Sequence, residues 1–134
     1  MKNIPGLVIS FIILCISNLY GQTKTTAMDN KNYSVEIIRY TISESQRSNF
    51  EKAYTDAAKF LQASKYCLGY QVIHGNDEPN NYIVIINWTS KEEHLQGFRK
   101  SAEFMPFFSL VKPFFNNIKE MKHYDLTPNK WIRE

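Results

Sequence analysis

One stretch limits what this chain can fold into more than any other: a strand signal that passes directly into a helix signal within Tyr82–Phe98. The run Tyr82–Ile86 (Y-I-V-I-I) carries no polar side chain on either alternation, which is typical of a strand covered on both faces. Ser90 and Glu93 follow with the spacing of a capping box, in which the hydroxyl accepts a backbone N–H of the first turn and the carboxylate reaches back. We therefore expect a helix over residues 91–99, joined to the strand by a tight corner.

A second helix is predicted earlier in the chain, after the first strand. Ser43 and Gln46 again have the spacing of a capping pattern. Apolar residues then recur at intervals of three and four, which places them on one helix face. These residues are Phe50, Ala53, Tyr54, Ala57 and Leu61. Most of the charged residues fall on the opposite side, so the pattern predicts an amphipathic helix.

The other segments complete an α+β order. Strands are predicted over 33–42, 68–74 and 118–126. The second of these strands should place on one face Leu68, Tyr70, Val72 and His74. The aromatic segment 101–115 has helical spacing, but prolines at 106 and 113 limit any helix there to a short piece. The resulting order, β-α-β-β-α-β, is the split βαβ arrangement of a ferredoxin-like fold.

Two of the strands predict how the sheet is covered. The segments 33–42 and 82–86 are apolar on both alternations, whereas the helices of this fold cover only one face of the sheet. An exposed apolar sheet face is typical of a surface that associates. We therefore predict a homodimer in which two sheets meet face to face, with two-fold symmetry as the default.

The N-terminal residues 1–21 have the pattern of a signal peptide. Lys2 supplies a short positive region, Leu7–Ile16 an apolar region, and Gly21 a small residue before the cleavage point. An uncleaved anchor is the alternative, although the apolar run is shorter than the roughly 20 residues that a membrane span needs. A lipoprotein at Cys15 is a weaker alternative, because a bulky leucine precedes that cysteine.

Cleavage would leave an exported protein, periplasmic or secreted, with no membrane contact. Residues 22–32 are polar and without period, which predicts a flexible linker. The domain itself is expected over 33–126, followed by a polar C-terminal tail over 127–134.

Charge and cysteine content exclude several classes of function. Loss of residues 1–21 removes only one charge, Lys2, from a formal net charge of +3. So small a bias, without any block of like charge, does not indicate binding to nucleic acid or to an anionic membrane. Cys67 would be the only cysteine left, so no intramolecular disulfide is possible and a buried thiol is expected.

Several motifs together resemble a known family. A hydrophobic strand ends in the corner Trp88–His94 (W-T-S-K-E-E-H), an apolar-aromatic helix and Ser101-x-x-Phe104 follow, and the last strand carries His123-Tyr124. Over roughly 33–125 this order resembles the antibiotic biosynthesis monooxygenase (ABM) family. The resemblance implies a dimeric α/β barrel of ferredoxin-like protomers. It also implies oxidation of quinols, anthrones or similar aromatics with no flavin and no metal.

The chain departs from the haem-degrading and the quinone-forming members of that family. The resemblance implies an Asn on the first strand, a Trp in the helix after the third strand and a later His for haem degradation. This sequence has instead Ile37, Ile38 and Arg39, then Gly97-Phe98, then Phe107-Phe108. Haem degradation is therefore disfavoured. The Asn and Arg of quinone-forming pockets also have no clear equivalents.

The candidate catalytic residues are His94 and Trp88. Oxygenation without a cofactor needs a base that ionises the substrate, donors for the developing oxyanion and a dry pocket. His94 is the candidate base, because histidine titrates near neutral pH, and the Trp88 indole N–H is the candidate donor. The residues expected to line the pocket are Tyr70, Phe98, Phe104 and Phe108.

A simpler interpretation stays open beside this one. Trp88 at a strand end is commonly a core residue, and His94 in a first helical turn commonly faces solvent. The chain would then be a non-catalytic ABM-like domain that binds a small apolar ligand or only dimerises. Among His74, His123 and Cys67 no spacing of a metal site is recognised, so no metal is predicted.

Overall fold

The structure, a computed structural model, describes residues 33–133. The predicted signal peptide, 1–21, and linker, 22–32, lie outside these residues. Within the described part of the chain, no helix is both long enough and apolar enough to cross a membrane.

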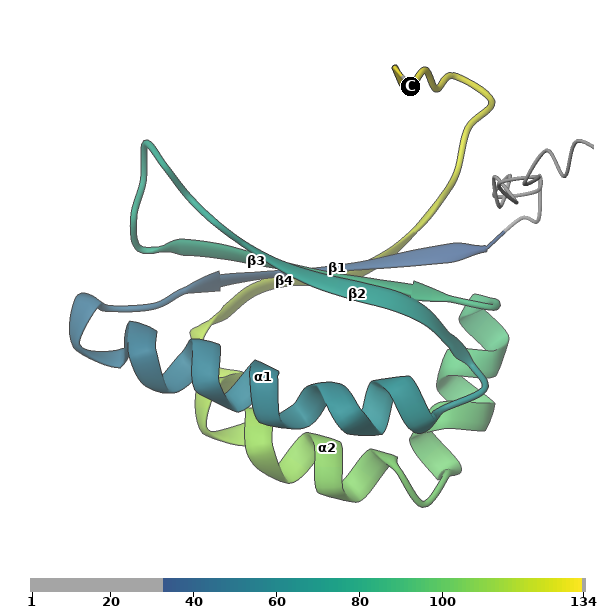
Figure 1. Ribbon diagram of the computed structural model, residues 1–134, viewed down its shortest axis with the longest axis horizontal. Helices are drawn as coiled ribbons and strands as arrows, with labels where there is room; N and C mark the ends of the chain where they lie inside the picture. Colours follow the sequence, from purple (N-terminus) through teal and green to yellow (C-terminus); the bar gives the residue numbers. More distant parts are fainter. Residues whose placement is uncertain (1–32, 134) are drawn as a thin grey trace, which may run out of the picture.

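Four strands and two main helices form the domain (Figure 1). In chain order they are β1 (Ser34–Thr41), α1 (Arg47–Ala63), β2 (Cys67–His74), β3 (Asn81–Trp88), α2 (Phe104–Val111) and β4 (Ile118–Asp125). Short helical turns join them: η1 (Glu44–Gln46), η2 (Glu93–Gly97), η3 (Phe98–Lys100) and η4 (Lys112–Asn117). The predicted β-α-β-β-α-β order is confirmed.

The strands form one antiparallel sheet in the order β2-β3-β1-β4, as a ferredoxin-like fold requires. Helices α1 and α2 lie side by side on one face of it (Figure 1). The central strands are therefore β3 and β1, whereas β2 and β4 are the edges. This order places the residues of β1 and β4 next to each other, although they are far apart in the sequence.

The core lies between the sheet and the helices. On the helix side of the sheet, alternate residues of β1 and β3 are buried, among them Ile38, Val84 and Ile86. The predicted stripe of α1 packs against them, and four of its members are buried: Phe50, Tyr54, Ala57 and Leu61. The buried residues of α1 recur with the helical period of 3.6, and those of β1 and β3 with the strand period of 2. The two sequence patterns therefore account for this core layer.

The opposite sheet face has no helix on it among the residues described (Figure 1). Ile37, Ile83 and Ile85 lie on that face and remain half-buried, while Ile73 on the edge strand is exposed. The two-sided apolar character predicted for β1 and β3 is therefore present in the fold.

Two local predictions are wrong. Leu68 does not share a face with Tyr70, because the pairing of β2 with β3 shifts between Cys67 and Gly69. This bulge turns Leu68 outward, where 54% of it is exposed. The Ser43 side chain bonds the Gln46 side chain instead of capping a backbone N–H, and a 3-10 turn precedes α1 there.

Helix α2 begins before Pro106, although the two prolines were expected to limit the helix to a short piece of the aromatic segment. Helix α2 starts at Phe104, so Pro106 lies within its first turn, where no N–H is needed. Pro113 falls in the first turn of η4. Each proline therefore lies in the first turn of a helical element, and the aromatic segment stays helical from α2 into η4.

Candidate functional site

The corner after β3 directs a histidine into the fold. The Ser90 hydroxyl accepts the Glu93 backbone N–H at 3.0 Å, which is the first half of the predicted capping box. The helix then widens into a π-helical turn, η2, that contains His94 and ends at Gly97. A Cβ at Gly97 would lie 2.6 Å from the Tyr66 ring, so only glycine allows this close packing.

His94 is buried against Trp88 instead of facing solvent. Only 3% of His94 and 1% of Trp88 are exposed. The imidazole and indole rings stack with centroids 4.2 Å apart and planes 4° from parallel. The corner therefore holds the imidazole in one plane, which suits a group that must meet a substrate in a set orientation.

A carboxylate lies behind these two rings. The Trp88 indole Nε1–H donates to Glu36 Oε2 at 2.9 Å, and the same oxygen is 3.7 Å from His94 Nδ1. Glu36 comes from the helix side of β1 and is only 2% exposed. Burial raises the pKa of the Glu36 carboxyl, and the Trp88 hydrogen bond opposes that rise.

A second histidine completes the cluster. His123 on β4 is paired with Glu36 on β1, and its Nε2 lies 2.8 Å from His94 Nδ1. His123 is half-buried on the edge strand. Desolvation lowers the pKa of His123, and the nearby cations Lys91 and Arg99 add to that effect.

Arg99 lies on the other side of the His94 ring. Its Nε–H points to His94 Nε2 at 3.5 Å. Burial, then the charge of Arg99 and then that of His123, lower the pKa of His94 to about 3. His94 is therefore neutral at pH 7. With Arg99 donating toward Nε2, the hydrogen-bond network assigns the proton to Nδ1, which donates to His123.

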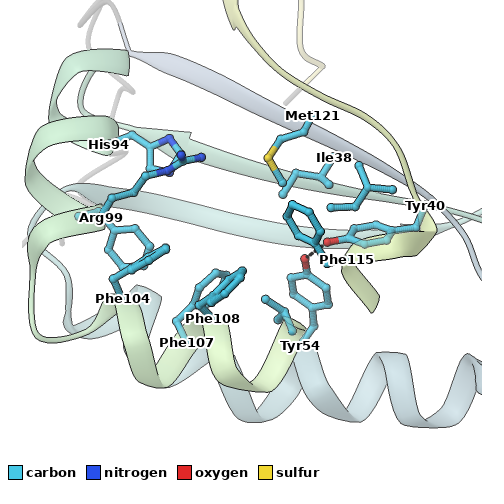
Figure 2. A pocket seen from close by; sticks show the side chains of 13 residues that line it. Ile38, Tyr40, Tyr54, His94, Arg99, Phe104, Phe107, Phe108, Phe115 and Met121 are labelled. Atoms are coloured by element: carbon cyan, nitrogen blue, oxygen red, sulfur yellow. Dashed lines mark hydrogen bonds between the residues drawn. The ribbon is translucent and has the colours of Figure 1, made fainter. Parts of the chain in front are cut away.

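A cavity of about 240 Å³ opens beside this cluster. Figure 2 shows His94 and Arg99 at one end and Tyr40 and Tyr54 at the other. The two tyrosine hydroxyls are hydrogen-bonded to each other at 2.7 Å. Between the two ends the walls are apolar and mainly aromatic, with Phe98, Phe104, Phe107, Phe108, Val111, Phe115, Ile38, Ile118 and Met121. The cavity is thus a mostly apolar space with a polar group at each end.

The structure brings together some of the predicted site residues and separates others. His94, Phe98, Phe104 and Phe108 line the cavity. Trp88 does not line it, because its ring lies behind His94 and its N–H is bonded to Glu36. The expectation that Trp88 donates directly to a substrate oxyanion is therefore wrong.

Tyr70 is also misplaced by the sequence-based prediction. It lines a separate hollow with Glu51, Gln71 and His74. The physical reason is the strand order: β2 is the edge farthest from β4, whereas the cavity lies between α2 and the β1–β4 side of the sheet.

Sequence reasoning missed Glu36, Arg99 and His123. Glu36 had a detectable signal, since it is a lone acidic residue on the alternation that continues with Ile38 and Tyr40. A buried carboxylate in such a place commonly has a partner. His123 entered the sequence analysis only through the family resemblance and gave no sign of a place in the site, because only the pairing of β1 with β4 brings it to Glu36.

Comparison with known proteins supports the fold and the family. The uncharacterized protein YczJ of Bacillus subtilis is 25% identical over 83 residues, which is 62% of this chain and 87% of that protein. A solved structure from Bordetella bronchiseptica, assigned to the antibiotic biosynthesis monooxygenases, is 20% identical with a TM-score of 0.59 and covers 72% of this chain and 96% of its own.

SnoaB of Streptomyces nogalater, a cofactor-independent oxygenase, is 16% identical with a TM-score of 0.57. That alignment covers 77% of this chain and 99% of SnoaB. The sequence model of the antibiotic biosynthesis monooxygenase family matches residues 34–108. This match spans more than half of the 134 residues, and the protein belongs to the antibiotic biosynthesis monooxygenase family.

Proposed function

We propose that this protein is a cofactor-independent monooxygenase that acts on a small quinol- or anthrone-type aromatic bound in the cavity. The observation that carries the proposal is the placement of His94: a neutral imidazole, buried and held in one plane, at the end of an aromatic cavity. Membership of the family and the fold likeness to SnoaB support it.

The reaction needs no electrons from outside the substrate. A base removes a proton from an activated C–H or phenolic O–H, and the resulting anion transfers an electron to dioxygen. The two radicals combine to form a C–O bond and a peroxide. Cleavage of the O–O bond with loss of the second hydrogen then gives a C=O group and one water. A CH₂ group and O₂ thus become C=O and H₂O.

His94 and Arg99 are suited to the first step. The His94 Nε2 lone pair, toward which Arg99 donates at 3.5 Å, accepts the substrate proton once the Arg99 donor turns to the substrate, while His94 Nδ1–H stays bonded to His123. The Arg99 guanidinium stabilises the anion that forms beside it. Although the low pKa makes free His94 a weak base, an anionic substrate next to the ring would favour its imidazolium form.

Trp88 and Glu36 act as positioning residues in this proposal. The indole covers one face of the imidazole and is itself held by the Glu36 carboxylate. The phenylalanines exclude water and stack on the substrate. Their edge-to-face and stacked contacts, such as Phe104 with Phe108 at 5.6 Å, leave the cavity with flat walls.

A homodimer and an exported location belong to the same proposal. The half-buried isoleucines on the open sheet face are an apolar surface that a second copy would cover. Export rests on the signal-peptide pattern of residues 1–21 alone.

A non-catalytic ligand-binding domain is the second candidate. The observation that favours it is the Tyr40–Tyr54 hydroxyl pair at the far end of the cavity, which could fix a polar group of an apolar ligand without any chemistry. Oxygen consumption separates the two candidates, because only the first uses dioxygen.

The test is oxygen uptake by the purified protein with a panel of quinols and anthrones. His94→Gln removes the base, and His74→Gln is the matched control at an exposed histidine outside the cavity. We expect one substrate to be turned over, about 10²- to 10⁴-fold more slowly by His94→Gln and normally by His74→Gln. Equal rates for the wild type and His94→Gln would refute the mechanism, and tight binding with no oxygen uptake would support the second candidate.

A further inference from the structure

We propose that Glu36, His94 and His123 form a binding site for one divalent first-row transition cation, of the class of Zn²⁺ or Co²⁺. This inference goes beyond the proposed oxygenase and does not depend on it. The donor atoms of the three side chains all lie within 4.8 Å of one another.

The fold brings the three donors together from three separate elements. Glu36 on β1 and His123 on β4 are opposite each other in the antiparallel pairing and share the helix side of the sheet. His94 reaches them from the η2 turn. Two of the three residues are buried and His123 is half-buried. The cluster is therefore inside the fold and is not a chance grouping of surface side chains.

Two of the donor separations are close to those around a bound ion. His94 Nδ1 is 2.8 Å from His123 Nε2 and 3.7 Å from Glu36 Oε2. Metal–donor bonds of about 2.0–2.2 Å place neighbouring donors about 3 Å apart around one cation. The set as a whole spans up to 4.8 Å, so a side chain would have to move inward by up to about 1 Å to seat the ion, which would replace the hydrogen between the two rings.

The chemistry of the set also fits. Two imidazoles and one carboxylate are a common three-ligand set for divalent zinc and iron, and they leave a position open for water or a ligand. The Trp88 N–H bonds the Glu36 carboxylate from outside the cluster, as residues around metal sites orient the ligands.

The charge environment of Glu36 supports a cation at this site independently of the donor geometry. Among residues 33–133, no Arg or Lys lies within ion-pair distance of its carboxylate, which accepts the Trp88 N–H at 2.9 Å and has the neutral His94 ring 3.7 Å away. Burial of a carboxylate without a cation is costly. A bound dication would provide the missing positive charge.

Arg99 is the group that opposes the ion. Its Nε is 3.5 Å from His94 Nε2, and a His94 that binds metal through Nδ1 must carry its proton on Nε2. The Arg99 side chain would then have to turn away, and since it is surface-exposed, it has room to do so. Removal of this charge should strengthen binding of the cation. Because β4 is an edge strand and His123 is only half-buried, we expect the ion to enter the site from solvent on the His123 side.

The test is a titration of the chelator-treated full protein with Co²⁺, followed by visible absorption, and with Zn²⁺, followed by calorimetry. We expect one ion per chain, with visible Co²⁺ bands. Affinity should fall at least about 100-fold in Glu36→Gln and in His123→Gln, stay the same in His74→Gln, and rise in Arg99→Gln. Circular dichroism checks that each variant is folded.

Absence of stoichiometric binding to the folded wild type would overturn the site. So would binding that survives in folded His123→Gln or that disappears in His74→Gln. The result is independent of the proposed oxygenase, because oxygen uptake by metal-free protein is measured separately. If both hold, added Zn²⁺ should inhibit uptake, because a His94 that binds the ion through Nδ1 carries its proton on Nε2, the proposed base. The His74→Gln protein should be inhibited equally.

Discussion

The imidazole of His94 lies flat on the indole of Trp88, with ring centroids 4.2 Å apart and planes 4° from parallel. The indole N–H is bonded to Glu36 on a neighbouring strand. Trp88 therefore links the end of β3 to β1 and at the same time orients the histidine. Trp88 therefore sets the orientation of the His94 ring in the candidate site.

The bond between Trp88 and Glu36 predicts a stability effect. Trp88→Phe keeps an aromatic ring under His94 but leaves a buried carboxylate without its donor. We expect the free energy of unfolding to fall by about 1–3 kcal/mol in urea denaturation. Trp131→Phe, at a tryptophan that is 74% exposed, is the control and should leave the midpoint unchanged. An unchanged midpoint in Trp88→Phe would mean that the indole bond contributes nothing.

Gly97 should tolerate no side chain while Tyr66 is present. An added Cβ would lie 2.6 Å from the Tyr66 ring, whereas at Gly69 nothing lies within 4 Å. We expect Gly97→Ala to lower the free energy of unfolding by about 1–3 kcal/mol and Gly69→Ala to be close to neutral. The double change Gly97→Ala/Tyr66→Leu should recover much of the loss, as a double-mutant cycle would measure. Simple addition of the two single effects would contradict the contact.

The tyrosine pair predicts a loss of stability at alkaline pH. Burial raises the pKa of Tyr40 from 10.0 to about 12, and burial raises the pKa of Tyr54 as well. Between pH 10 and about pH 12 the unfolded chain has lost the tyrosine protons that the folded chain still holds. The free energy of unfolding therefore falls as pH rises above about 10.

The size of this effect can be measured by thermal or urea unfolding across pH 8–12. The Tyr40 shift corresponds to a loss of about 3 kcal/mol once pH reaches its folded-state pKa. Tyr40→Phe should make the dependence shallower, and Tyr33→Phe, outside the pair, should not. A slope that is identical in all three proteins would rule out the pair as the cause.

The open sheet face predicts the oligomeric state. Ile85 is paired with Ile37 at the centre of that face, and a lysine there would place a charge in the proposed dimer contact. We expect light scattering to find a dimer for the wild type and a monomer for Ile85→Lys. Gln62→Lys, on the exposed side of α1, is the control and should remain a dimer. A wild-type monomer, or a dimeric Ile85→Lys protein, would refute the face-to-face association.

The order of elements could be predicted because its signals are local. The stripe of α1 and the apolar run of β3 each appear within a few turns or residues of the chain. The Ser90 cap and the following turn are equally local, which is why His94 was identified. Leu68 was misplaced because a bulge depends on how β2 pairs with β3, and its own residues do not show that pairing.

The sequence by itself determined the fold class, the apolar character of both sheet faces and the corner that holds Trp88 and His94, since each follows from neighbouring residues. Only the tertiary structure decided what surrounds His94. Glu36 and His123 reach it through the β1–β4 pairing, and Arg99 through the turn after η2. Such contacts between distant residues are set by strand order and packing. They show that Trp88 supports His94 instead of donating to the substrate, and they join His123 to the proposed metal-binding set.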